Sequence, residues 1–334
     1  MKILNISRKI VQRIERFYKR NIVMDQYPML TSISRKKLMN EGAIGLVYML
    51  HHISDKDPKG IPTNEDLKVS PTFLEKVIMK YKRNGFDFIS LDQLYTIVLS
   101  GEKPAQPFIC FTIDDGYLDN YTNALPVFEK HNVPFAIFVA TDFIDKRAVL
   151  WWDSLEELIM THDEIIISNG EKYVCRSFQD RWDTFRLLRE RILNLNQCCL
   201  EEELISMFSA YEIDWLAPIR NKGMSWNQIR ELSRHPLCTI GGHTVTHPAL
   251  NKLSSVEVVK EIKEGIIKIV EQTQKDISFF AYPYGTPMEI GDREFQIVKD
   301  LKIRMAFMAH QGCVTIDNLE LTKIPRVYLN EMKR

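Results

Sequence analysis

Two histidines stand four residues apart in the segment Thr239-Ile-Gly-Gly-His243-Thr-Val-Thr-His247-Pro248. At this spacing both imidazoles can face one point in space. Upstream, an apolar run is followed by two adjacent carboxylates, Asp114 and Asp115. One carboxylate and two imidazoles make a facial metal site with open positions for water and substrate, and the spare carboxylate can then act as a general base. The pattern favours Zn²⁺, with Co, Ni, Mn or Fe as alternatives.

Each cluster also has a plain structural explanation. Asp-Asp-Gly is a common composition of exposed turns, and many histidine pairs have no ligand. Two adjacent carboxylates at the end of a buried strand, however, repel each other and lose solvation, and a bound cation compensates for both costs. Because both clusters follow a predicted strand, their combination favours the metal hypothesis over either turn or core packing.

The elements that must position these residues alternate between strands and helices. We predict strands at 43–51, 86–90, 108–114, 134–140, 238–241, 278–282 and 304–309, and helices at 71–84, 91–99, 123–131, 226–233, 255–275 and 293–301. Such alternation predicts an α/β fold with a parallel sheet or barrel. The chemistry of such barrels lies at the carboxyl ends of the strands, where Asp114, Asp115, His243 and Tyr284 fall.

Residues from about 151 to 223 interrupt this alternation. They are rich in charged residues and helix formers, with only a short strand signal at 164–168, and we predict a mostly helical insertion. The chain length of 334 residues suits one large domain, which we place at 41–334. Residues 1–40 are expected to form a basic amphipathic helix and a linker. Trp151 and Trp152, at the start of the insertion, could stack on sugars or anchor the insertion to the barrel.

Composition narrows the range of partners. The 44 basic and 44 acidic residues cancel, so there is no global positive field for nucleic acid. We expect no secretory signal and no transmembrane segment, and six cysteines without a CxxC pair fit reduced thiols in the cytoplasm. Residues 1–24 could lie peripherally on the inner face of the membrane or dock on their own domain.

Four segments resemble motifs of the polysaccharide deacetylase family, the NodB-homology enzymes of carbohydrate esterase family 4. The segment from Phe111 to Gly116 is similar to the T-F-D-D-G motif, and His243-Thr-Val-Thr-His247-Pro248 to the H-S/T-x-x-H motif. Phe280-Ala-Tyr-Pro283-Tyr284-Gly285 resembles the segment along one side of the catalytic groove. Val47-Tyr-Met-Leu-His51-His52-Ile53 resembles the strand that opens many members.

The resemblance implies a distorted (β/α)7 barrel and a set of roles. Asp115, His243 and His247 would bind the metal, and Asp114 would be the general base. The backbone N–H of Tyr284 would hold the oxyanion of the reaction. The resemblance leaves two candidates for the proton donor to the leaving amine. His51 is favoured because of the form of the opening strand, and His310 is the alternative by position.

One departure from the family pattern concerns the base. Many members carry an arginine that pairs with the base aspartate, and Ala281 stands at its place here. The resemblance implies a metal-dependent hydrolase that removes N-acetyl groups from amino sugars of a polysaccharide or glycoconjugate. The alternatives are a deformylase or deacetylase of a lipid-linked sugar at the cytoplasmic membrane face, and a carbohydrate-binding pseudoenzyme.

Overall fold

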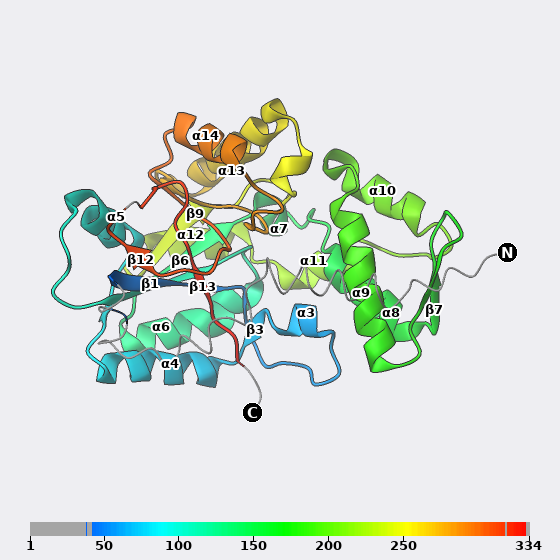
Figure 1. Cartoon of the computed structure of the whole chain (residues 1–334), viewed down its shortest axis with the longest axis horizontal. Helices are drawn as coiled ribbons and strands as arrows, with labels where there is room; N and C mark the ends of the chain where they lie inside the picture. The colour runs from blue at the N-terminus through cyan, green and yellow to red at the C-terminus, as the bar shows by residue number, and fades with distance from the viewer. Residues whose placement is uncertain (1–37, 39–41, 318, 332–334) are drawn as a thin grey trace.

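A curled, mainly parallel sheet forms the centre of the molecule (Figure 1). The structure is a computed structural model that describes residues 38, 42–317 and 319–331. The strand order is β11-β10-β9-β6-β5-β1-β12, with β13 beside β1 and β4 beside β5. The bounds are β1 Ala43–Leu50, β4 Asp87–Phe88, β5 Phe108–Ile113, β6 Phe135–Val139, β9 Cys238–Gly242, β10 Phe279–Ala281, β11 Met305–Phe307, β12 Val314–Thr315 and β13 Val327–Tyr328.

The central strands are parallel and in continuous register. Strand β1 pairs with β5 from Gly45 opposite Phe108 to Leu50 opposite Ile113, and β6 pairs with β9 in the same direction. Every residue of β1 and β5 is buried, which explains why both read as unbroken apolar runs. The predicted α/β fold with a parallel sheet is confirmed, since the parallel strands curl into an open half-barrel.

Helices cover both faces of the sheet. In Figure 1, α4 (Pro71–Arg83) and α6 (Leu125–His131) run below it, and α13 (Ser255–Thr273) and α14 (Asp292–Asp300) lie above it. Helices α5 (Leu91–Ser100) and α12 (Trp226–Arg234) complete the set of long crossovers. Ser225 and Gln228 form a capping box at the start of α12.

Most of the segment between residues 151 and 222 gathers at one end of the molecule (Figure 1). It contains α8 (Trp151–Thr161), β7 (Glu164–Ile166), β8 (Lys172–Val174), α9 (Phe178–Leu193), η3 (Gln197–Cys199), α10 (Leu200–Met207) and α11 (Ala217–Lys222). These elements bury an apolar cluster of their own around Trp151, Phe185 and Leu188. Whether 151–223 behaves as a separate insertion in a 41–334 domain stays a prediction.

Several short elements were not predicted. They are β2 (His52–Ile53), α3 (Pro62–Glu65), β3 (Lys68–Val69), η2 (Asn120–Ala124), α7 (Thr141–Ile144) and η4 (Leu250–Lys252), together with β8, β12 and β13. A strand of two or three residues has no measurable periodicity, so its pairing depends on tertiary contacts that a sequence pattern does not carry.

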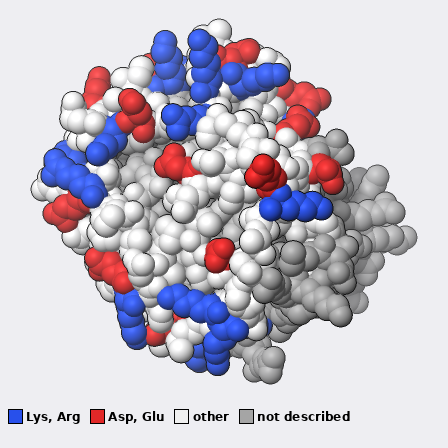
Figure 2. All heavy atoms as spheres, turned by 90° about the vertical axis from the view of Figure 1, so that its left-hand side faces the viewer, with Lys and Arg blue, Asp and Glu red and all other residues white. Residues whose placement is uncertain are grey.

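The predicted helix at 1–24 and its membrane contact lie outside the described residues. Within the described part of the chain, no helix is long and apolar enough to cross a bilayer. Figure 2 shows the end of the molecule opposite the α8–α10 segment. Basic and acidic side chains alternate around that face and form no field of a single sign.

Candidate active site

The carboxyl ends of the parallel strands bring the predicted site residues together. Asp114 and Asp115 directly follow β5, His243 directly follows β9, and His51 directly follows β1. Tyr284 lies three residues beyond the end of β10. Because neighbouring parallel strands end at the same edge of the sheet, residues far apart in the sequence meet there.

Asp115, His243 and His247 form a compact buried cluster. Oδ1 of Asp115 lies 3.3 Å from Nε2 of His243 and 3.4 Å from Nε2 of His247. The three potential ligand atoms lie within 4.8 Å of one another. Oδ1 of Asp115 is buried and has no hydrogen-bond partner within the described residues. A buried carboxylate oxygen without a partner is costly, and a cation between these three side chains would satisfy it. The donor set therefore fits a divalent metal ion.

The surroundings of the two histidines suit them as candidate metal ligands. Nδ1 of His243 lies 2.7 Å from the carbonyl oxygen of Ala281, so Nδ1 carries the proton and Nε2 keeps its lone pair. Burial lowers the pKa of His247 to about 4, so this imidazole is neutral at pH 7. Burial alone would raise the pKa of Asp115, but the neighbouring imidazoles outweigh it and hold this pKa below its usual value.

The loop between the two histidines is held from α13. Thr244 and His247 have positive φ angles of 70° and 62°, which most residues avoid. Glu261 on α13 accepts hydrogen bonds of 2.9 Å from the backbone N–H groups of Val245 and Thr246. It also accepts one of 2.9 Å from the hydroxyl of Thr246. Three bonds from a rigid helix to two adjacent residues fix the loop conformation that aims His247 at Asp115.

Helix α13 also approaches this loop very closely. A Cβ atom on Gly265, one turn beyond Glu261, would lie only 2.8 Å from the carbonyl oxygen of Thr244. Glycine is therefore required at this position for the helix to reach the loop. Glu261 and Gly265 together make α13 the support of the candidate metal site.

Asp114 has a different environment from Asp115. Its two carboxylate oxygens each accept a 2.7 Å hydrogen bond from the guanidinium of Arg326, and both side chains are buried. Arg326 is itself held by the Met308 carbonyl and the Thr112 hydroxyl. Burial would raise the pKa of Asp114, but Arg326 and the neighbouring imidazoles outweigh it and lower this pKa. Asp114 is thus a carboxylate that stays ionised and is oriented by a bidentate partner.

Sequence reasoning missed Arg326, which supplies the pairing that the family pattern places at Ala281. Instead, the arginine comes from the segment that leads into β13. One signal could have found it. Arg326 is the only charged residue in the run Ile324-Pro-Arg-Val-Tyr-Leu329, and a charge inside an apolar run needs a buried partner.

The two candidate proton donors lie in different places. His51 lines the cavity beside Asp114 and Asp115, and its Nδ1 is buried without a partner within the described residues. Burial lowers the pKa of His51, while the two carboxylates oppose that change. His310 is exposed and does not line the cavity, although its carbonyl accepts a 3.0 Å bond from the backbone N–H of Arg326. Of these two histidines, the structure brings only His51 to the candidate metal ligands.

A cavity of about 200 Å³ opens above these groups. Trp151 is only 2% exposed and donates a 3.3 Å hydrogen bond from Nε1 to the hydroxyl of Tyr284, so it anchors α8 to the barrel. Trp152 lines the cavity, and its ring centre lies 5.8 Å from that of His247. Tyr284 has a φ of 57°, and its backbone N–H makes no hydrogen bond within the described residues. The cavity thus has an aromatic wall and an available backbone donor.

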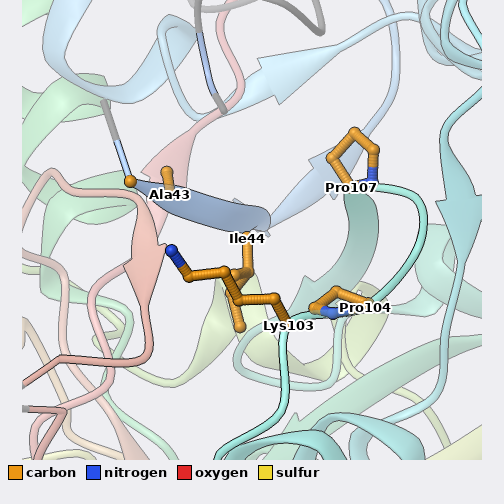
Figure 3. A pocket seen from close by; sticks show the side chains of 6 residues that line it. Ala43, Ile44, Lys103, Pro104 and Pro107 are labelled. Atoms are coloured by element: carbon orange, nitrogen blue, oxygen red, sulfur yellow. The ribbon is translucent and has the colours of Figure 1, made fainter. Parts of the chain in front are cut away.

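A second hollow lies at the opposite end of β1 (Figure 3). It has a volume of about 40 Å³ and is lined by Gly42, Ala43, Ile44, Lys103, Pro104 and Pro107. Lys103 is the one titratable side chain among these residues, so the hollow offers no paired groups for catalysis.

A comparison with known protein families shows which family this chain belongs to. The family model of the polysaccharide deacetylases matches residues 101–306, which is more than half of the sequence. The chain belongs to the polysaccharide deacetylase family. The match contains Asp114, Asp115, His243, His247 and Tyr284, whereas His51 and Arg326 fall outside it.

Individual relatives of this chain are distant in sequence. YxkH of Bacillus subtilis, a protein provisionally named as a polysaccharide deacetylase, is 25% identical over 112 residues. That match spans 34% of this chain and 37% of YxkH.

Solved structures share the fold of this chain at low sequence identity. The deacetylase PplD of Streptococcus pyogenes, solved with acetate, superposes with a TM-score of 0.57 at 18% identity, over 85% of this chain and 92% of PplD. The deacetylase domain of BpsB from Bordetella bronchiseptica gives a TM-score of 0.54 at 17% identity, over 86% of this chain and 96% of that domain. These structures support the curled sheet and its helices.

Proposed function

We propose that this protein is a divalent-metal-dependent hydrolase that removes N-acetyl groups from amino sugars of a polysaccharide or glycoconjugate. One observation carries the proposal. The unpartnered carboxylate oxygen of Asp115 lies among two imidazole nitrogens, beside a second carboxylate that Arg326 holds ionised. Family membership supports deacetylation as the reaction that these groups perform.

Asp115, His243 and His247 would hold the metal ion, and Zn²⁺ suits two nitrogen ligands and one oxygen ligand. When bound, such an ion polarises a carbonyl group and lowers the pKa of water. Two neutral imidazoles and one carboxylate leave part of the metal's charge uncompensated, which favours both effects.

Asp114 would act as the general base that accepts a proton from the water attacking the acetyl carbonyl carbon. Its bidentate contact with Arg326 keeps it ionised and fixes the direction of its free lone pairs. The backbone N–H of Tyr284 would donate a hydrogen bond to the oxygen on which negative charge develops. Both groups act before the C–N bond breaks.

His51 would donate a proton to the nitrogen of the leaving amine. It is the histidine that lines the cavity apart from the two candidate ligands. The two nearby carboxylates favour its protonated form and so oppose the effect of burial. Protonation of the nitrogen lets the amine leave as the C–N bond breaks, and acetate is the second product.

Acetate release tests this proposal directly. Protein reconstituted with Zn²⁺ should release acetate from oligomers of N-acetylated amino sugars, and the same protein treated with chelator should not. The assay should measure formate from matched N-formyl substrates in parallel, because formate release alone would favour the deformylase. If calorimetry detects binding of the oligomers without release of either acid, the protein is a carbohydrate-binding pseudoenzyme.

A further inference from the structure

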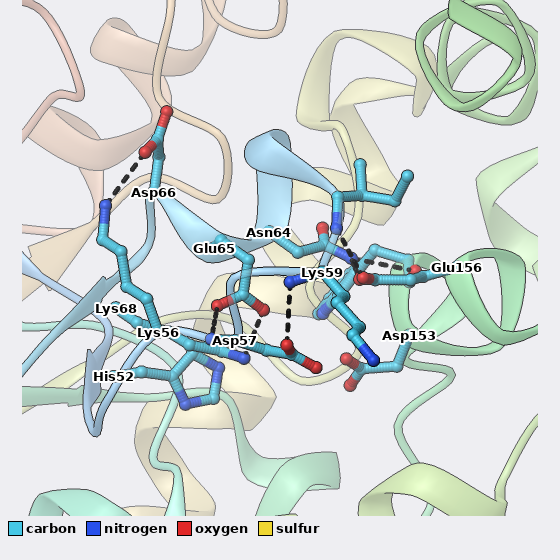
Figure 4. A network of polar contacts seen from close by, with 12 residues as sticks. His52, Lys56, Asp57, Lys59, Asn64, Glu65, Asp66, Lys68, Asp153 and Glu156 are labelled. Carbon is cyan, nitrogen blue, oxygen red and sulfur yellow. Dashed lines mark hydrogen bonds and ion pairs between the residues drawn. The ribbon is translucent and has the colours of Figure 1, made fainter. Parts of the chain in front are cut away.

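The loop between β2 and β3 forms part of the cavity wall. It contains α3 and brings Thr63, Asn64 and Leu67 to the lining of the cavity. Figure 4 shows this loop beside α8, with polar contacts that connect the two. The loop lies outside residues 101–306 that match the family.

The amide nitrogen of Asn64 donates hydrogen bonds to two residues of α8. Nδ2 donates a 2.6 Å hydrogen bond to Oε2 of Glu156 (Figure 4). It also donates a 3.2 Å hydrogen bond to the backbone carbonyl of Trp152. A carboxylate and a carbonyl only accept hydrogen bonds, so they fix which end of the amide is the nitrogen. The oxygen must therefore point away from α8.

The carboxylate of Glu156 is also fixed from both sides. Its Oε1 accepts a 2.6 Å hydrogen bond from the backbone N–H of Ile61, one turn before Asn64 (Figure 4). With both oxygens bonded to the same loop, Glu156 cannot rotate without breaking a contact. It therefore holds the amide of Asn64 in a single orientation.

Oδ1 of Asn64 is left as a free acceptor. It makes no hydrogen bond within the described residues and is not among their fully enclosed unpartnered atoms. The residue is only 7% exposed and lines the cavity, so the small accessible area of Asn64 faces that space. A preoriented acceptor at a cavity wall is available to a donor group of a ligand, which would replace water there.

We propose that Asn64 determines specificity by accepting a hydrogen bond at Oδ1 from a sugar-ring hydroxyl of the substrate, and that Glu156 is its positioning residue. This inference rests on the proposed function for the identity of the ligand. The neighbouring residue Trp152 presents an aromatic ring to the same cavity. An aromatic face beside a hydrogen-bond acceptor suits a sugar, which has apolar C–H faces and a rim of hydroxyls.

Deoxy sugars test the proposed hydrogen bond. The substrates are an N-acetylglucosaminide and its 3-deoxy, 4-deoxy and 6-deoxy analogues, assayed with the wild-type protein and with Asn64→Ala. We expect Asn64→Ala to lower kcat/KM for the parent sugar about tenfold. One deoxy analogue should show a similar loss with the wild type and no further loss with Asn64→Ala. If the variant loses the same factor on the parent and on every analogue, the proposal is wrong.

Glu156→Gln tests the positioning role without removing Asn64. A Gln amide in this place can offer a donor to Asn64, so the Asn64 amide can invert and present its nitrogen to the cavity. We expect KM for the parent sugar to rise while kcat stays within about twofold, and the analogue that identifies the hydroxyl should show no such rise. Glu157→Gln, at an exposed neighbour on α8, is the matched control and should change neither constant.

This test remains decisive if the proposed reaction is wrong. Should the wild type release no acetate, calorimetric binding of the same four sugars to the wild type and to Asn64→Ala replaces the kinetic readout. If Asn64→Ala weakens the binding of every sugar except one deoxy analogue, the role of Asn64 is supported even then. Equal binding of all four sugars to both proteins would overturn it.

Discussion

Adjacent aspartates in this protein have opposite environments. Asp115 faces the imidazoles of His243 and His247, whereas Asp114 faces the guanidinium of Arg326. Consecutive residues at the end of a strand point in different directions, and Asp115 has a positive φ of 79°. This geometry supports a ligand role for one carboxylate and a base role for the other.

The first prediction separates these roles. Asp114→Asn should keep the metal but lose acetate release by about 10³-fold or more, because the amide cannot accept the proton. His243→Ala should lose both metal and activity. Metal content by elemental analysis, together with acetate assays, measures both effects. Equal loss of metal in the two variants would contradict the division of labour.

The second prediction concerns Arg326. In Arg326→Met the pKa of Asp114 should rise, because burial then acts without the opposing guanidinium. A base is active above its pKa, so the acidic limb of the kcat/KM profile should move to higher pH. Removal of the Arg326 guanidinium should also lower the free energy of unfolding by about 3–5 kcal/mol near neutral pH, because it leaves the buried Asp114 carboxylate unpaired.

The pH dependence of stability has a definite sign for this pair. The lowered pKa of Asp114 in the folded state stabilises the wild type above the pKa of the unfolded chain, and this contribution disappears as the pH falls through the folded-state pKa. Denaturant titrations should therefore show wild type and Arg326→Met converging at low pH. Arg304→Met, at a half-exposed arginine, is the control, and an equal effect of both variants would refute the assignment.

At the scale of single residues, the sequence predicts the candidate metal ligands and the base, but it does not predict the residue that pairs with the base. Asp114, Asp115, His243 and His247 are recognisable because each follows an apolar strand. Arg326 is more than 200 residues from Asp114, as the hydrogen bond between them spans 212 positions. No local pattern connects residues at that separation, so their pairing depends on the placement of the final segment beside β1.

At the scale of elements, α13 supports the loop that carries both histidines. The third prediction is that Glu261→Ala weakens metal binding by about 10- to 100-fold, because the loop loses three hydrogen bonds. Competition with a chromophoric chelator measures the metal dissociation constant. Glu264→Ala, at an exposed position of the same helix, should leave it unchanged. A similar effect of both variants would mean that α13 acts only through general stability.

The long elements were predictable, whereas several short ones, such as β2, β3, β12 and β13, were not. Strands β1, β5 and β6 are buried on both faces, so their sequences are continuously apolar and unambiguous. The two-residue strands β12 and β13 pair with β1 only because the chain returns to it after β11. The loop at α3 has no strong pattern either, although it contributes Asn64 to the cavity.

At the scale of the whole molecule, the α8–α10 segment completes the cavity that the barrel begins. Trp151 and Trp152 both line the cavity, but they differ in burial. Trp151 is 2% exposed and packs in the buried cluster with Phe185, whereas Trp152 is half-buried and packs against the edge of that cluster. The cavity therefore depends on how this segment docks against the strand ends.

The fourth prediction tests this docking. Trp151→Ala should lower the free energy of unfolding by about 3–5 kcal/mol, because it removes a large buried side chain. Trp152→Ala should cost less stability and mainly raise KM. Denaturant titration and steady-state kinetics separate the two effects. A larger loss of stability from Trp152→Ala would reverse the two assignments.

The most direct test of the central claim is a metal titration of the metal-free wild-type protein, with the rate of acetate release from an N-acetylglucosamine oligomer as the readout. The three ligands form a single site, so the rate should rise linearly with added Zn²⁺ and reach a plateau at about one equivalent. His243→Ala should show no rise over the same range. Full acetate release from wild-type protein that retains less than about a tenth of an equivalent of metal would contradict the proposed mechanism.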